Sequence, residues 1–184
     1  SEELSIFCGC DFYSNLSSIS SDGIIWTTYT TVSGAARSPF NTLWVPDLSL
    51  FLSTGNTIAT RTVGIMTSPN GITWTTRLTP NISSTTSTWQ WVAWSPDIKV
   101  LIAVPYPGAV IGRSTDGINW SSYSTPNNEL TRCHWVSFLK LFVVSSINGT
   151  SRIMTSPDGI TWTSRTTSSF AWRGITSSPE LRLV

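Results

Sequence analysis

Apolar and polar residues alternate along most of the chain, in short runs separated by turn-forming residues. This alternation places successive side chains on opposite faces of a β-strand. Residues 89–123 show it clearly and predict four strands, at 89–94, 98–104, 109–114 and 118–123. The helical period of 3.6 residues is not apparent in the sequence. The pattern therefore predicts an all-β protein.

A seven-residue pattern occurs four times: serine, any residue, Asp or Asn, glycine, two further residues, and tryptophan. Asp-Gly or Asn-Gly between alternating apolar residues predicts a hairpin with a type I′ turn. The serine and the Asp or Asn can accept backbone N–H groups, and the tryptophan can cover the turn with apolar surface. These residues are therefore predicted to be structural: Asp22, Gly23, Trp26, Asn70, Gly71, Trp74, Asp116, Gly117, Trp120, Asp158, Gly159 and Trp162.

The four tryptophans recur about every 45 residues, which is the period of propeller blades with four strands each. Residues 1–184 are predicted to form a single β-propeller domain with repeats at 1–31, 39–77, 88–124 and 130–165. Each repeat supplies one antiparallel sheet, and a strand at 170–176 closes the ring by completing the first sheet. The alternative is an arc or half of a larger propeller. A monomer and a self-assembled dimer thus both remain open.

Two segments resemble the Asp-box repeats, also called BNR repeats, of sialidase-like β-propellers. They are Met-Thr-Ser-Pro-Asp-Gly-Ile-Thr-Trp at 154–162 and Ser-Pro-Glu-Leu at 178–181. The resemblance covers nearly the whole chain and is closest to the regular arrays of phage, giant-virus and environmental proteins. It implies a propeller but not an activity, because one fold hosts many functions.

Charged residues make up only 11% of the 184 residues, and the formal net charge is +1. Ordinary domains contain about 25% charged residues, and a nucleic-acid-binding surface is strongly basic. The apolar runs are also much shorter than the roughly 20 residues that span a bilayer. We therefore expect neither a nucleic-acid partner nor membrane insertion. The sequence leaves localisation unknown, with extracellular and virion-associated settings both open.

Candidate chemistry is sparse in this sequence. Cys8 and Cys10 are expected on one face of a strand, whereas the neighbours Cys133 and His134 should point to opposite faces, so we expect no metal site. We expect no other cofactor. The sialidase resemblance would imply an arginine cluster for the substrate carboxylate, a tyrosine nucleophile with a glutamate partner, and an aspartate as the acid. The arginine-isoleucine-proline word of that family is missing, since Arg152-Ile153 is followed by methionine. A non-enzyme is predicted, and a sialidase-type glycosidase is the less favoured hypothesis.

When the repeats are aligned, with Asn41, Trp91 and Arg132 in one column, they differ most where the innermost strand of each sheet begins. This diversity, after loops such as 78–88 and 125–130, predicts a ligand-facing mouth. Loops rich in Asn, Ser and Thr, with scattered aromatic residues, provide the hydrogen bonds and apolar platforms that sugars require. The predicted function is lectin-like recognition of a glycan or glycoprotein receptor. The alternative is a structural or protein-docking propeller, such as a virion component or an assembly factor. The predicted ligand-binding residues are Asn41, Trp89, Trp91, Tyr106, Arg132 and Arg173.

Overall fold

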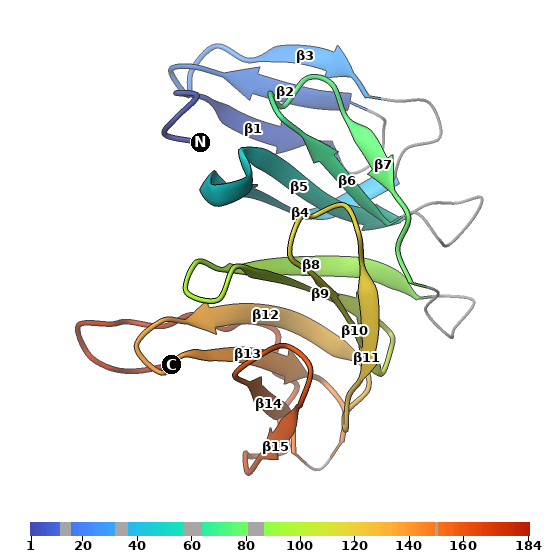
Figure 1. The fold of residues 1–184 in the computed structure, drawn as a ribbon, viewed down its shortest axis with the longest axis vertical. Helices are drawn as coiled ribbons and strands as arrows, with labels where there is room; N and C mark the ends of the chain where they lie inside the picture. The colour runs from blue at the N-terminus through green and yellow to red at the C-terminus, as the bar shows by residue number, and fades with distance from the viewer. Residues whose placement is uncertain (12–15, 32–36, 57–63, 81–86, 150) are drawn as a thin grey trace.

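A computed structural model of the protein describes residues 1–11, 16–31, 37–56, 64–80, 87–149 and 151–184. Within these ranges the chain forms fifteen β-strands in four antiparallel sheets (Figure 1). In every sheet the strands follow one another in chain order, so each sheet is a meander. None of the described segments is a helix long and apolar enough to span a membrane.

The first sheet contains β1 (Phe7–Cys10), β2 (Leu16–Ser20) and β3 (Thr27–Thr30). The second contains β4 (Arg37–Val45), β5 (Leu50–Asn56), β6 (Ile65–Ser68) and β7 (Thr75–Arg77), with the short 3₁₀ turn η1 (Pro46–Leu48) between β4 and β5. The third contains β8 (Thr88–Ser95), β9 (Val100–Tyr106), β10 (Val110–Ser114) and β11 (Ser121–Ser124). The fourth contains β12 (Leu130–Val136), β13 (Leu141–Ser146), β14 (Ile153–Ser156) and β15 (Thr163–Arg165).

The strands predicted for residues 89–123 agree with β8 to β11 within a few residues. The largest difference is in β11, which begins at Ser121 and not at Ile118. The backbone N–H groups of Ile118 and Asn119 donate to Asp116 Oδ1, both at 2.8 Å, and so belong to the turn. The alternation of apolar and polar side chains located β11, but the bonds to Asp116 determine where this strand begins.

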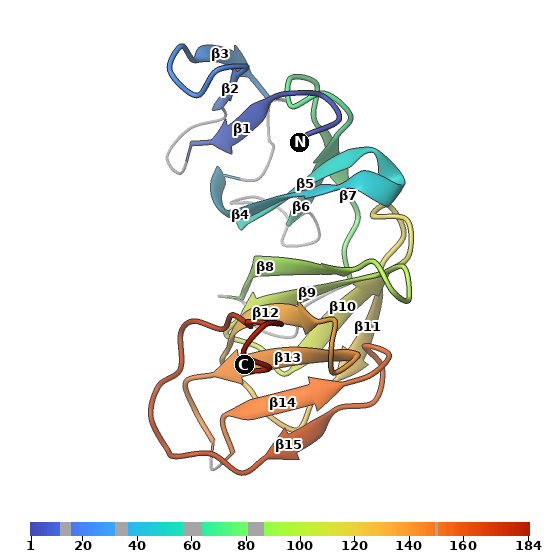
Figure 2. The same ribbon diagram turned by 90° about the vertical axis from the view of Figure 1, so that its left-hand side faces the viewer.

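The four sheets form an open arc, and the predicted closed four-sheet ring is wrong. Residues 170–176, expected to complete the first sheet, adopt no regular strand. They lie beside the fourth sheet, where Thr131 Oγ1 donates to Trp172 O at 2.9 Å and His134 Nε2 lies 2.9 Å from Ser177 Oγ. Figures 1 and 2 show the N-terminus with the first sheet and the C-terminus beside β13. The first sheet therefore has three strands.

The position of this C-terminal segment has a physical reason. Thr54 Oγ1 of β5 donates to Gln90 O of β8 at 2.9 Å, which is the same kind of hydroxyl-to-carbonyl bond that Thr131 makes to Trp172. Thr54 lies on the second strand of its sheet and Thr131 on the first strand of its own, so the two bonds show only that the C-terminal segment, like β8, is bonded to the sheet that precedes it. It extends the array in the direction already set and does not cross back to β1.

The four recurring turns have one structure, illustrated by residues 156–162. Ser156 Oγ accepts from the backbone N–H of Asp158 at 3.3 Å and of Gly159 at 2.8 Å. Asp158 Oδ1 accepts from the N–H groups of Ile160 and Thr161, at 2.8 and 3.0 Å. The prediction that these side chains cap the turn is confirmed, and Asn70 Oδ1 makes the equivalent bonds, both at 2.9 Å.

The predicted type I′ geometry is wrong. It requires positive φ at both central residues, and the described turns show it only at the glycines, with φ of 75°, 75°, 72° and 75° at Gly23, Gly71, Gly117 and Gly159. The Asp or Asn before each glycine keeps negative φ, and its side chain accepts from the N–H groups of the two residues that follow the glycine. Only the glycine must occupy the left-handed region.

Three of these turns pack against the preceding sheet. A Cβ at Gly71 would lie 3.0 Å from Ile19 Cγ2, and one at Gly159 would lie 3.0 Å from Ile102 Cγ2. At Gly117 the nearest atom is Leu52 Cδ2, at 3.4 Å. The glycines are therefore needed for the close approach of neighbouring sheets as well as for the turn itself.

The turn tryptophans join three apolar clusters between the sheets. Trp74 packs with Phe51 and Met66, against the partly buried Cys8 and Cys10 of the first sheet. Trp120 packs against the cluster shared by the second and third sheets, and Trp162 belongs to the one shared by the third and fourth. The second, third and fourth sheets thus each place their turn tryptophan in the interface with the sheet before them.

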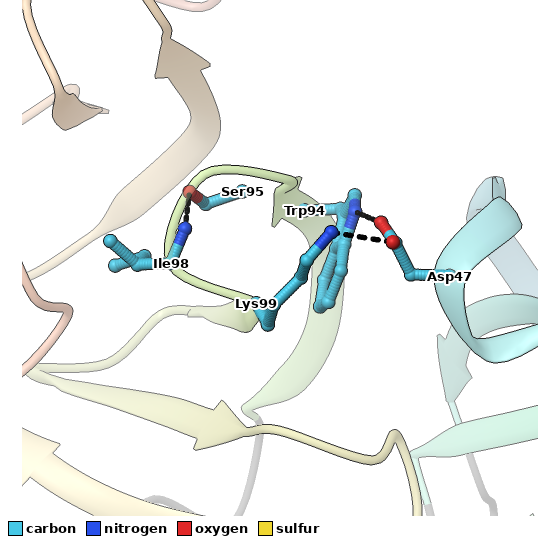
Figure 3. A network of polar contacts seen from close by, with 5 residues as sticks. All are labelled: Asp47, Trp94, Ser95, Ile98 and Lys99. Carbon is cyan, nitrogen blue, oxygen red and sulfur yellow. Dashed lines mark hydrogen bonds and ion pairs between the residues drawn. The ribbon is translucent and has the colours of Figure 1, made fainter.

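An acidic side chain also links successive sheets, as Figure 3 shows for the second and third. Trp94 Nε1 donates to Asp47 Oδ2 at 3.2 Å, and Lys99 Nζ lies 2.5 Å from Asp47 Oδ1. The hydrogen bond from Lys99, together with that from Trp94, lowers the pKa of Asp47. The prediction located only a tight turn here and missed the contact between sheets.

The same contact recurs on both sides of this one. Trp135 Nε1 donates to Asp97 Oδ2 at 2.6 Å, and Lys140 Nζ pairs with Asp97 Oδ1 at 2.5 Å. Between the first and second sheets, Trp44 Nε1 donates to Glu3 Oε2 at 2.6 Å. An acid in the turn of one sheet therefore accepts from the tryptophan of the next.

Candidate functional site

The innermost strands β4, β8 and β12 of three successive sheets carry most of the predicted ligand-binding positions. Each has a register shift near its start, between Arg37 and Asn41, between Trp89 and Trp91, and between Leu130 and Arg132. Such β-bulges redirect neighbouring side chains and are common next to binding sites. The three strands thus share an irregularity at the positions where their sequences differ.

Trp91 and Arg132 meet across the boundary between the third and fourth sheets. The guanidinium carbon of Arg132 lies 4.2 Å from the centre of the Trp91 ring system. Arg132 Nη1 also donates to Thr131 O at 2.9 Å, so the guanidinium is held from two sides. A cation stacked in this way on an aromatic face gains about 0.5–2 kcal/mol, more as the pair is desolvated.

Arg173, in the C-terminal segment, is a second positive charge that acts on Arg132. Burial lowers the pKa of Arg132, and the positive charge of Arg173 lowers it further. The two ion pairs among the described residues both involve lysines, so neither arginine has a carboxylate partner within this part of the chain. Positive charge of this kind favours an anion, and a carboxylate can bind one guanidinium through two parallel hydrogen bonds.

The other predicted residues lie elsewhere. Asn41 Oδ1 accepts from the backbone N–H of Val92 at 3.1 Å, which ties β4 to β8. Trp89 is only 1% exposed and donates to Thr79 Oγ1 at 3.0 Å. A ligand in solution cannot reach this buried ring, so we leave it out of the candidate site. Tyr106 is half-buried at the end of β9, where it pairs with Thr88 of β8 and not with Trp91.

A separate hollow of about 300 Å³ lies near the end of β9. Loop 125–130, which was predicted to line the mouth, contributes two of its residues, and Arg132 is not part of it. The other predicted mouth loop, 78–88, includes residues 81–86, which lie outside the described residues. The hollow is lined by Ser87, Pro107, Gly108, Ala109, Val110, Asn128 and Glu129.

The cysteines and the histidine are placed as structural groups. Cys8 and Cys10 both pack against the apolar cluster between the first and second sheets. A hydrogen bond from the Cys8 thiol lowers the pKa of Cys10 to about 7. Burial raises the pKa of Cys133 and lowers that of His134. Across the described ranges, no three His, Cys, Asp or Glu side chains are grouped as metal ligands.

Sequence reasoning missed Thr131, whose carbonyl holds Arg132 and whose hydroxyl holds the C-terminal segment. The aligned columns treated the inner strands as regular, so the extra residue of each bulge was not recognised. The signal lies in the pairing of β8 with β9: β8 advances by two residues, from Trp89 to Trp91, where β9 changes by only one, from Pro105 to Val104.

Neither a family model nor a curated protein sequence matches the chain. Among solved structures it is similar to virginiamycin B lyase from Staphylococcus aureus, with 17% identity and a TM-score of 0.71 over 91% of this chain and 54% of that one. A streptogramin B lyase gives 14% identity and a TM-score of 0.71 over 91% and 53%. A chain of a nidogen/laminin complex gives 10% identity and a TM-score of 0.60 over 82% and 54%.

The chain spans about half the length of these solved structures. At such low identity the similarity concerns the fold alone, and the matched proteins are β-propellers. The four sheets therefore have the arrangement of β-propeller blades, in an open arc.

Proposed function

We propose that the chain is a non-catalytic binding module whose inner strands recognise an acidic carbohydrate. The observation that carries this proposal is the stacking of Arg132 on Trp91, at 4.2 Å, to which Arg173 adds a further positive charge. The guanidinium groups supply the donors for a carboxylate. Half-buried aromatic surface next to them offers the apolar contact that a sugar ring makes.

The state of the acidic side chains supports a non-catalytic role. Glycosidases of the usual kind need two carboxyl groups on either side of one bond. Asp22, Asp116 and Asp158 here accept backbone N–H groups within their own turns. Asp47 and Asp97 bind an indole and a lysine of the next sheet. Each of these five carboxylates thus has a structural task.

The four turns also support membership of the Asp-box repeat family, which is part of the same proposal. Their serine and Asp or Asn side chains make the same set of bonds in each copy, and every turn has glycine at positive φ. Conservation of this bond network across four copies supports a shared repeat better than sequence words alone.

Isothermal titration tests the binding proposal. The ligands are a uronic-acid oligosaccharide and the same compound with its carboxyl group reduced to an alcohol. We expect a dissociation constant between about micromolar and millimolar for the acid and at least about tenfold weaker binding of the alcohol. Arg132→Gln should weaken binding of the acid about tenfold, the loss expected for one charge-assisted contact. Equal affinity for the two compounds would contradict the role of the arginines.

Arg165→Gln is the matched control, because Arg165 lies on the outer strand β15 and donates to Thr155 Oγ1. It should leave binding unchanged. Incubation with the same oligosaccharide should release no product, and turnover would refute the non-catalytic role.

A protein partner is the second candidate. It is favoured by the similarity to a chain of the nidogen/laminin complex, a propeller seen with a protein partner. Absence of binding across a broad array of acidic and neutral glycans would favour this candidate over the first.

A further inference from the structure

The turn of the first sheet is exposed where the other three are buried. Gly71, Gly117 and Gly159 are buried against the preceding sheet, whereas Gly23 is exposed. Trp26 is 46% exposed although Trp74, in the same position of the next turn, is 1% exposed. We call residues 20–26 the leading turn. Its bonds match those of the other turns, with Gly23 N donating to Ser20 Oγ at 2.9 Å, so it is fully formed, but no other sheet among the described residues covers it.

The fourth sheet has the complementary feature on its outer face. Ile65, Ile111 and Ile153 occupy the same position on the third strand of their sheets, as the register with Arg77, Tyr123 and Arg165 shows. Ile65 and Ile111 are fully buried beneath the next sheet. Ile153, which has no sheet beyond it among the described residues, is only half-buried.

Ile153 lines a cavity of about 450 Å³, which we call the terminal cavity. Val143 and Thr155 also line it, and they are paired across β13 and β14. The equivalent pairs are Cys8 with Ile19 and Ile102 with Arg113. Those two pairs receive Gly71 and Gly159 respectively, within 3.6 Å of each glycine's ideal Cβ. The terminal cavity is therefore the position where a fifth turn of this kind would seat.

We propose that the terminal cavity of one chain receives the leading turn of a second copy of this chain. Within the chain, three turns of this sequence already pack against such a face of the preceding sheet. A second copy offers the same kind of turn and the same kind of face, so the proposed contact repeats one that the chain already makes. The contact seats Gly23 near Val143 and Trp26 near Ile153. The C-terminal segment is consistent with it, since Ser177 lies 2.9 Å from His134 of β12, beside the fourth sheet, and the first sheet has only three strands.

One rearrangement accompanies the contact. Ser1 and Ile6 are joined by two backbone bonds, and Ser178 and Leu183 are joined in the same way. The two segments therefore fold into the same turn, and only one of them can occupy it in a joint sheet. The other must leave, which weakens the association relative to the interfaces within a chain.

The contact is heterologous, because the two chains contribute different surfaces. Sedimentation equilibrium of the full chain from about 1 to about 200 µM covers the expected affinity range. The mass should rise above 20.2 kDa with concentration. Ile24→Glu, in the leading turn, should raise the dissociation constant at least about tenfold. Ile24 is 83% exposed, so this change should leave the fold intact, as circular dichroism can verify.

Ile118→Glu is the matched control, since Ile118 has the same position in the third turn and is 42% exposed there. It should change association less than about twofold. Ile153→Glu should abolish association from the cavity side. If that variant does not fold, the Ile24→Glu comparison still decides the question.

Mixing the Ile24→Glu and Ile153→Glu chains tests the direction of the contact. One retains an intact cavity and the other an intact leading turn, so the mixture should recover association that neither shows alone. A mass that stays at 20.2 kDa at every concentration would overturn the proposal. Association of Ile24→Glu as strong as that of the unchanged chain would do so as well, and failure of two folded variants to complement would exclude the head-to-tail contact.

Discussion

Replacing the turn tryptophans one at a time provides a graded test of how the sheets are held together. The side chain, the turn and its bonds are nearly constant among the copies, but exposure is 1% for Trp74, 9% for Trp162 and 46% for Trp26. Alanine at a fully buried tryptophan costs about 3–5 kcal/mol in the free energy of unfolding. Trp26 buries only about half as much, which predicts roughly 2 kcal/mol for Trp26→Ala.

A smaller difference separates the two buried sites. Trp74 Nε1 donates to Gly71 O at 3.0 Å, whereas Trp162 Nε1 is buried without a partner among the described residues. Removing an unpaired buried donor recovers part of its desolvation cost, about 1 kcal/mol. The expected order of destabilisation is therefore Trp74→Ala, then Trp162→Ala, then Trp26→Ala.

Urea unfolding followed by circular dichroism at low protein concentration, with linear extrapolation, measures these differences. Unfolding slopes must be compared first, because repeat arrays can lose cooperativity. Asp158→Asn is the internal control and should cost less than about 0.5 kcal/mol, the range of neutral surface changes, because Asn70 already makes the same bonds. A loss for Trp26→Ala as large as that for Trp74→Ala would show that burial between sheets is not what makes these residues important.

The remaining predictions concern groups whose surroundings are specific to the fold. Because burial lowers the pKa of His134, the unfolded chain binds the proton more readily than the folded chain. The free energy of unfolding should therefore fall as pH drops below about 6.5, and His134→Gln should reduce this pH dependence in melts at pH 5 to 8. Iodoacetamide at pH 7.5 should label Cys10 in the native chain and spare buried Cys133, as peptide mapping can show. Asp97→Asn should cost only about 0–1 kcal/mol in denaturant melts, and less at high salt, because the ion pair with Lys140 is largely exposed.

The sequence was sufficient to predict the all-β class, the four turns and the strands of the third repeat, because these features depend on local pattern. Asp116, for example, caps its own turn with bonds two and three residues away. Such local bonds are the same in any surroundings. Closure of the ring could not be predicted in this way, since it depends on which of two surfaces residues 170–176 prefer.

The candidate site was predicted in part, for a similar reason. Trp91 and Arg132 stand in one aligned column, so their contact follows from packing two inner strands side by side. Trp89 was misplaced because the bulge between it and Trp91 puts the ring into the cluster between the second and third sheets. A single inserted residue changes the direction of a side chain without changing its type, and sequence alternation cannot register that change.

The acid-to-tryptophan contacts set which repeats can follow one another along the chain. Glu3 accepts from Trp44, and Asp97 accepts from Trp135, so the donor always stands one repeat after the acceptor. After the fourth sheet this pairing stops, because Phe138 takes the place of the acid and meets Arg182 at 5.8 Å. Genetic exchange that moves two adjacent repeats together would therefore keep the hydrogen bond between the acid of the first and the tryptophan of the second. A lone fourth repeat placed earlier in the array would leave the following indole without its acceptor.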